Sequence, residues 1–230
     1  MLTMPNNMLG RPGEDLLGIV EDFVTKLRNG TITSGQAKKF LRKEDPWVCP
    51  MDIESQLTRV LSLYAEAFGL TLDPASVPIP ARSPGFDRLI VVPQGITLGK
   101  VVAYLRTKFE VSLYTEDLDQ DVEKNDRTNT TTYAIWVRDV VEADEELANL
   151  SANDLTAQKI SSETLLERLL HGLLYFTENG KHLDVKNVTL CAGSRTAGGD
   201  VSRVYWYAGL HRLHVSWYCP GCRDVYLRAR

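Results

Sequence analysis

Residues 161–180 read SSETLLERLLHGLLYFTENG and carry the strongest secondary-structure signal in the chain. Leucines recur along this stretch at the three- and four-residue spacing of one helical face. Asn179–Gly180 then ends the pattern, because glycine adopts the left-handed conformation without a steric penalty. The face consists of Leu165, Leu166, Leu169, Leu170, Leu173 and Leu174. We predict a helix over residues 162–178 that packs this leucine face against a sheet.

Strand-like segments, rich in β-branched and aromatic residues, lie on both sides of this helix. The expected strands are residues 88–93, 111–114, 131–139, 187–192, 202–207 and 210–218, with further helices over 97–109 and 142–150. The pattern predicts an α+β fold, with a helical N-terminal region followed by a mostly antiparallel sheet packed with helices.

The N-terminal part reads as three helices. We expect them over residues 14–28, from a Thr33–Gln36 capping box through residue 43, and over residues 53–68. Residues 73–85 contain four prolines, which favour an extended and semi-rigid segment. The expected organisation is therefore a helical region at 1–72, a proline-rich linker at 73–86 and an α+β domain at 87–230.

Composition is that of an ordinary globular protein. The 230 residues are 43% hydrophobic and 24% charged, with a formal net charge of −4, so a core can form without metal or disulfide support. Four cysteines are too few for a disulfide-built scaffold. Neither a signal-peptide pattern nor a membrane-spanning apolar run is present in the sequence, so we expect a cytoplasmic protein with reduced thiols and no membrane partner.

The sharpest chemical motif is HRLHVSWYCPGC at residues 211–222. If Ala208–Gly209 is a two-residue turn, Trp206 pairs with His211, Val204 pairs with Leu213, and the two histidines of the motif point to opposite faces of the strand. Zinc would then need the CxxC turn together with thiols from elsewhere. The candidate metal ligands are Cys219, Cys222, Cys49 and Cys191.

Two other interpretations of the CxxC turn stay open. One is a thioredoxin-like redox pair, although the tail after Cys222 has weak helical character. The other is two ordinary thiols in a turn, which we favour. No cofactor is otherwise expected.

A basic cluster on the N-terminal helices is the second candidate site. Six cations and no acid lie between Thr25 and Lys43, where two helices meet at a short turn. They are Lys26, Arg28, Lys38, Lys39, Arg42 and Lys43. Such a cluster could bind nucleic-acid phosphates, and the alternative is a solvated helix face.

Three weaker patterns favour structural roles. The acidic run at 116–126 lacks the glycine and the glutamate of a calcium-binding loop, so we expect a solvated loop. The glycine-rich run at 191–200 precedes a strand, which favours a hairpin loop over a phosphate site. Glu167 and His171 lie four residues apart on the polar side of the leucine helix, where we expect an exposed pair.

The segments YAIWVRD, EADEELANLSANDL, TLLERLLHGLLYFTENGKHLD and NVTLCAGSR resemble a family of uncharacterised bacterial hypothetical proteins. The resemblance covers about residue 40 to the C-terminus. It implies a similar strand-rich end without the CxxC turn, and it implies no activity.

Our first functional hypothesis is a non-enzymatic binding or regulatory protein, because no catalytic motif stands out. The alternatives are a nucleic-acid-binding protein that uses the 26–43 helix pair and a zinc protein or enzyme that uses the C-terminal CxxC. The partner, whether nucleic acid or protein, and any catalytic residues stay open.

Overall fold

The structure is a computed structural model that describes residues 14–41 and 52–230, and the chain forms two compact units, residues 1–50 and 51–230. The first unit contains α1 (Glu14–Arg28) and α2 (Ser34–Leu41). The predicted capping box at the start of α2 is confirmed. The Gln36 N–H donates to Thr33 Oγ1 at 3.2 Å, and the Thr33 N–H donates to Gln36 Oε1 at 2.8 Å.

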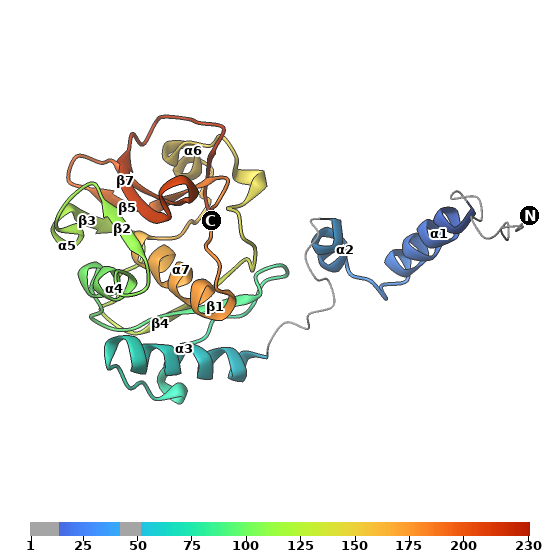
Figure 1. The fold of residues 1–230 in the computed structure, drawn as a ribbon, viewed down its shortest axis with the longest axis horizontal. Helices are drawn as coiled ribbons and strands as arrows, with labels where there is room; N and C mark the ends of the chain where they lie inside the picture. The colour runs from blue at the N-terminus through green and yellow to red at the C-terminus, as the bar shows by residue number, and fades with distance from the viewer. Residues whose placement is uncertain (1–13, 42–51) are drawn as a thin grey trace, which may run out of the picture. The chain divides into compact units, whose positions relative to one another are not determined.

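The predicted leucine helix, α7 (Leu165–Asn179), lies in the middle of the second unit, between a six-stranded sheet and a two-stranded ribbon (Figure 1). Its leucine face is buried, as predicted, apart from Leu166, which is half-buried. The opposite side is buried as well and carries Glu167, Arg168 and His171. A helix enclosed on all sides needs protein partners for such polar groups, because leaving them unpaired away from water is costly.

The six-stranded sheet has the order β2 (Glu110–Leu113), β7 (Arg212–Tyr218), β6 (Val201–Tyr207), β5 (Val188–Thr196) and β3 (Val122–Asn125), with β8 (Leu227–Arg228) pairing beside β5. The β3–β5, β5–β6 and β6–β7 pairs are antiparallel, whereas β2–β7 and β5–β8 are parallel. The α+β fold class, with helices at the N-terminus followed by sheet, is confirmed.

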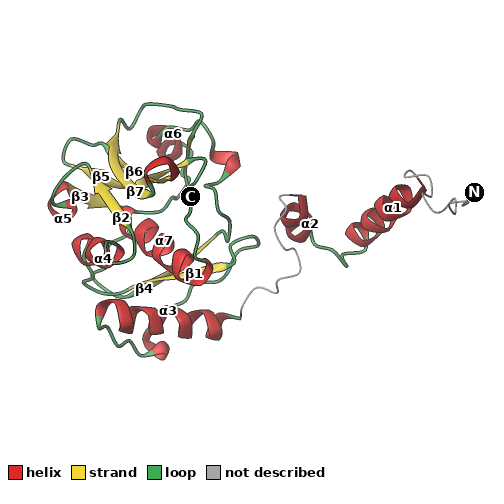
Figure 2. Cartoon of the chain, viewed as in Figure 1, coloured by secondary structure: helices red, strands yellow, loops and turns green. Residues whose placement is uncertain are grey.

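The two-stranded ribbon pairs β1 (Arg88–Val92) with β4 (Tyr133–Val137), antiparallel. All of β1 is buried, because α7 packs on it from one side and α3 (Ile53–Phe68) from the other (Figure 2). The Tyr64 hydroxyl of α3 donates to the Val91 carbonyl at 2.7 Å. The third N-terminal helix therefore belongs to the second unit, and the chain divides at residue 50 rather than at the expected linker of residues 73–86.

The β6–β7 hairpin differs in register from the expected two-residue turn. Trp206 pairs with Leu213 and Val204 with Val215, because η3 (Ala208–Leu210) and a left-handed His211 lengthen the connection. His214 consequently pairs with Tyr205, whereas the expected register places it opposite Arg203. The shift is two residues, so apart from His211 the assignment of side chains to the two faces is unchanged.

Two local expectations, one of a helix and one of a loop, are corrected. In place of a helix over 142–150 the chain forms only the single turn η2 (Glu145–Leu147), because the Asp144 and Asn149 N–H groups donate to the Ala229 and Leu227 carbonyls. The acidic run contains α5 (Leu118–Asp121) and β3, and the Asp119 carboxylate accepts the Leu98 N–H at the start of α4 (Leu98–Leu105). The glycine-rich run is the β5–β6 hairpin, as expected.

Two short elements complete the described chain, namely η1 (Pro74–Ser76) and α6 (Ala152–Ala157). Within the described ranges, no helix has the length and apolar character that a membrane crossing requires.

Candidate ligand-binding site

The site begins with Glu163, which lies just before the N-cap of α7. Its backbone N–H donates to the Arg230 carbonyl at 2.7 Å, and its carbonyl accepts the Gly193 N–H at 3.2 Å, so the segment is held between β5 and the residues that follow β8. Gly193 permits this approach. A Cβ there would lie 3.0 Å from the Ser162 carbonyl oxygen and 3.1 Å from that of Glu163.

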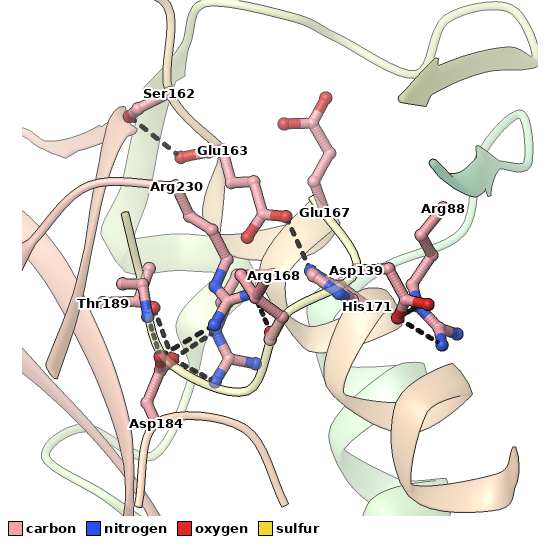
Figure 3. Close-up of polar contacts among 12 residues, drawn as sticks. Arg88, Asp139, Ser162, Glu163, Glu167, Arg168, His171, Asp184, Thr189 and Arg230 are labelled. Carbon is pink, nitrogen blue, oxygen red and sulfur yellow. Dashed lines mark hydrogen bonds and ion pairs between the residues drawn. The ribbon is translucent and has the colours of Figure 1, made fainter. Parts of the chain in front are cut away.

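A capping box starts α7 immediately after Glu163. The Glu167 N–H donates to Thr164 Oγ1 at 3.2 Å, and Glu167 Oε2 accepts the Thr164 N–H at 2.7 Å. These bonds set the direction in which the chain enters the helix. They direct the side chain of Glu163 toward His171, which lies in the second turn of α7 (Figure 3).

Glu163 and His171 form a buried acid–imidazole pair. Glu163 Oε1 lies 2.8 Å from His171 Nδ1, and the two side chains are 2% and 0% exposed. Burial raises the pKa of Glu163 to about 7 against the opposing effect of Arg230 and Arg168. Burial and the nearby arginines hold the pKa of His171 well below its usual value. Near neutral pH the imidazole is therefore uncharged, and Glu163 changes its ionisation.

Asp184 is the centre of a buried ionic cluster next to this pair. Its carboxylate accepts from Arg168 Nη2 at 2.6 Å, from Arg230 Nη2 at 3.0 Å, from the Ala143 N–H at 3.0 Å and from the Thr189 hydroxyl. Burial alone would raise the pKa of Asp184, but the two guanidinium groups outweigh it and the pKa is lowered. The cluster around Asp184 is thus ionic and closely hydrogen-bonded.

Arg127 closes the other side of the site through a bidentate pair with Glu167. Its Nε and Nη2 donate to the two carboxylate oxygens, each at 2.6 Å, and Nη2 also donates to the Ser162 carbonyl at 2.6 Å. The Tyr133 hydroxyl donates to Glu167 Oε1 at 2.9 Å. Fork-to-fork contacts of this kind fix the positions of both side chains.

A pocket of about 350 Å³ lies next to this cluster, and of the residues described above Arg127, Ser162, Glu163 and Arg230 line it. Phe86 and Trp136 provide aromatic walls, and the Trp136 indole N–H donates to the Pro80 carbonyl at 2.8 Å. The lining is Pro80, Ala81, Ser83, Phe86, Arg127, Ile135, Trp136, Val137, Arg138, Asp144, Ser161, Ser162, Glu163 and Arg230. Apolar walls over a few fixed polar groups are typical of a small-molecule site.

Three buried lining residues carry a polar atom for which the described part of the chain offers no hydrogen-bond partner. These atoms are Glu163 Oε2, Arg230 Nε and Asp144 Oδ1, and the three residues are 2%, 7% and 7% exposed. Figure 3 shows the second oxygen of Glu163 on the side of Arg230. The other polar atoms of Arg230 are used, since Nη1 donates to the Val140 carbonyl and Nη2 to that of Val141 and to Asp184.

The cysteines of the sequence-predicted metal site do not gather in the described chain. Cys219 and Cys222 are exposed on a turn closed by the Cys222 N–H and the Cys219 carbonyl at 3.2 Å, whereas Cys191 is buried in β5. Among the described residues no group of three or more metal-binding side chains is close enough to hold an ion. Cys49 lies outside the described residues, so zinc binding that involves it stays a prediction.

The basic cluster is only partly described. Lys26 pairs with Asp22 at 2.6 Å, Arg28 ends α1, and Lys38 and Lys39 are in α2. Arg42 and Lys43 lie outside the described residues. Nucleic-acid binding by this cluster also stays a prediction.

The expectation of an exposed Glu167–His171 pair is wrong. Both side chains are fully buried, and they bind different partners, Arg127 and Glu163. The sequence contains a signal for this burial. Tyr175, one turn after His171, shares that side of the helix, whereas a solvated side is rich in lysine and glutamate.

Sequence analysis also missed Glu163, Arg168, Asp184 and Arg230. Each is an isolated charged residue whose partner lies elsewhere in the chain, so local spacing carries no signal for it.

Comparison with known proteins adds no relative: no family model, curated protein or solved structure matches the chain.

Proposed function

We propose that the protein binds a small organic molecule in the pocket above Glu163 and acts as a binding or regulatory protein. One observation carries the proposal. Three buried polar atoms without a protein partner belong to residues that line a single pocket with aromatic walls. A buried polar group left unpaired destabilises a protein by about 1–3 kcal/mol, so native structures contain few of them. A ligand that pairs with these atoms removes that penalty.

The size and rigidity of the pocket support the same proposal. Ligand sites range over roughly 300–1,000 Å³, and a volume of about 350 Å³ suits a compact molecule. Bidentate contacts from Arg127 to Glu167 and the contacts around Asp184 hold the polar groups in place before a ligand arrives. Preorganisation of this kind reduces the entropy that binding would otherwise lose.

A fragment library of broad chemistry, screened by NMR on the ¹⁵N-labelled full chain, tests the proposal. The Trp136 indole N–H reports on the pocket wall, since it is fixed by the Pro80 carbonyl. Ser83→Trp should fill the pocket and abolish binding. Thr131→Trp is the matched control, because Thr131 lines a separate hollow with Gln94 and Thr132.

Fragments that shift the Trp136 signal, and that bind the control but not Ser83→Trp, would support the proposal. A library without such fragments would overturn it. If the chain turned over a substrate and Glu163→Gln abolished this activity, the protein would be an enzyme rather than a binding protein.

A further inference from the structure

We infer that Cys219 and Cys222 form a thiol–disulfide exchange site, in which the two thiols reduce a low-molecular-weight disulfide such as glutathione disulfide and close to a disulfide of their own. The site is separate from the proposed function, because neither cysteine belongs to the lining of the pocket. Three features of the turn support the inference: its geometry, its attachment to the rest of the fold and the exposure of its two side chains.

The geometry of the turn matches that of a disulfide. Residues 219–222 form a β-turn centred on Pro220 and Gly221, closed by the bond from the Cys222 N–H to the Cys219 carbonyl at 3.2 Å. The Cα atoms of the first and fourth residues of a β-turn lie less than about 7 Å apart. A disulfide joins Cα atoms that are about 4.4–6.8 Å apart. The two thiols are also hydrogen-bonded to each other, so the turn already has the span that a disulfide needs.

Contacts with α6 hold the turn in this form. The Pro220 carbonyl accepts the Asn153 N–H at 2.9 Å. Arg223 donates through Nε and Nη2 to the two carboxylate oxygens of Asp154, at 2.8 and 2.6 Å, and Asp154 is itself fixed by the capping box that it forms with Ser151. A short flexible tether gives a second thiol an effective concentration in the millimolar range, and a fixed orientation raises it. The second thiol of the turn is therefore placed to complete an exchange that the first one starts.

Exposure distinguishes this pair from the third described cysteine. The side chains of Cys219 and Cys222 are exposed, so a small disulfide can reach them, whereas Cys191 is buried in β5. Among the described residues, the cysteine available to complete an exchange at Cys219 is thus Cys222.

The chain after the turn sets the direction of the exchange. Residues 223–230 contain β8 and no helix. In thioredoxin-like proteins a helix starts at the CxxC motif and stabilises the thiolate, and strong stabilisation of the reduced form makes such a pair an oxidant. Without that helix the disulfide form is favoured, so we expect the dithiol to act as a reductant.

The exchange takes two steps. Cys219 attacks first, because its sulfur accepts hydrogen bonds from the Gly221 N–H and from the Cys222 thiol, and such donors stabilise a thiolate. It bonds to one sulfur of the small disulfide, whose S–S bond breaks and releases one half as a thiolate. Cys222 then loses its proton to water and attacks the Cys219 sulfur, which releases the other half. Two electrons pass from the protein to the small disulfide, and the two released thiolates take up the two protons that the cysteines lost.

Incubation of the reduced full-length protein with an excess of glutathione disulfide, without oxygen, tests the inference. Free thiols are then blocked with N-ethylmaleimide and the protein is digested with trypsin, which leaves both cysteines in one peptide, residues 213–223. Mass spectrometry should find this peptide with an internal disulfide. In about 1 mM reduced glutathione the closed form should exceed the form with glutathione attached by at least about tenfold, because the second thiol has the higher effective concentration.

Two variants assign the reaction to this turn. In Cys222→Ser the second step is impossible, so glutathione should stay attached to Cys219. Cys49→Ser is the matched control, and its 213–223 peptide should close to the same extent as that of the wild-type protein. The wild-type peptide tests the inference even if a variant fails to fold.

Four results would overturn the inference: a 213–223 peptide with both thiols free, attached glutathione as abundant as the closed form, loss of closure in Cys49→Ser, and bound zinc that prevents the reaction until a chelator removes it. The last result would make the turn a metal site. None of them touches the proposed function, which is decided by the fragment library and by Ser83→Trp.

Discussion

The pKa values of Glu163 and His171 predict that a proton moves from the imidazole to the carboxyl group when the chain folds. Between about pH 4.5 and 6.5 the unfolded chain carries this proton on the imidazole, because the ordinary pKa values of the two groups are 4.5 and 6.5. In the folded protein the order is reversed, and the carboxyl holds the proton up to about pH 7. Both states bind one proton, so the pair contributes almost no pH dependence to stability in this window.

Single substitutions should reveal this compensation as two slopes of opposite sign. In His171→Gln only Glu163 titrates, and it binds a proton in the folded state that the unfolded state lacks. The free energy of unfolding should therefore fall as the pH rises from 5 to 6.5, by up to about 1.4 kcal/mol per unit. In Glu163→Gln only His171 titrates, and the free energy of unfolding should rise over the same range. Urea unfolding at four pH values measures both slopes, and parallel curves for the two variants would contradict this account.

Asp184 is the residue whose loss should destabilise the fold most. Asp184→Asn would leave the guanidinium groups of Arg168 and Arg230 without their counter-ion, and both arginine side chains are only 1% exposed. Removing one partner of a buried ion pair costs about 3–5 kcal/mol. Urea unfolding at pH 7 measures the loss. Glu110→Gln, at an exposed pair with Arg212, should cost less than about 1 kcal/mol, and equal losses would refute the prediction.

Among the elements, the close approach of β5 to the start of α7 is the most sensitive contact for the site. Gly193→Ala would place a methyl group about 3 Å from two backbone oxygens and Thr164 Cγ2, so the segment that carries Glu163 must move. We expect a lower melting temperature and a displaced Trp136 indole signal. Gly198→Ala in the same hairpin has only Thr196 Oγ1 nearby, at 3.9 Å, and should leave the Trp136 signal in place. Identical spectra for both variants would show that the contact is unimportant.

The two cysteines of the CxxC turn should react with thiol reagents faster than the cysteine of β5. Cys219 and Cys222 are exposed and hydrogen-bonded to each other, and this contact lowers the pKa of Cys219. Burial raises the pKa of the Cys191 thiol. Peptide mapping after iodoacetamide treatment should find Cys219 modified first and Cys191 only after unfolding. Rapid labelling of Cys191 in the folded protein would contradict its burial, and elemental analysis of the untreated protein would test zinc directly.

Element by element, the sequence predicted what depends on local pattern. The leucine helix and the main strands follow from periodicity, and the two faces of β7 were predicted because a two-residue shift preserves them. The expected helix at 142–150 failed because distant carbonyls, those of Leu227 and Ala229, take its backbone donors. No local pattern encodes that competition.

At the scale of the whole molecule, the second unit should fold without the first. Within residues 14–41 and 52–230, its two hydrophobic clusters draw only on residues between 57 and 229. A chain of residues 52–230 should therefore melt within about 2 °C of the full chain and bind the same fragments. Scanning calorimetry measures the first property and NMR the second. A fall of more than about 5 °C would mean that the N-terminal residues stabilise the second unit.

The candidate site was beyond prediction from sequence for a reason that belongs to this scale. Arg127 contacts Glu167 across 40 residues, and Arg230 contacts Asp184 across 46. Such pairs need the complete topology to be known before they can be proposed. Only the Thr164–Glu167 capping box and Tyr175 on the side of α7 opposite the leucines were visible locally, and neither indicates a pocket.

The contacts of Arg230 with the Val140 and Val141 carbonyls join positions 90 and 89 residues apart. Contacts across such long loops form late, because closing the loop costs entropy before the contact stabilises the chain. The pocket should thus be among the last features to appear during refolding. Binding of a dye or ligand to the pocket would therefore follow the final folding step. Its signal should reach the native value later than the intrinsic fluorescence and the helix content of the refolding chain.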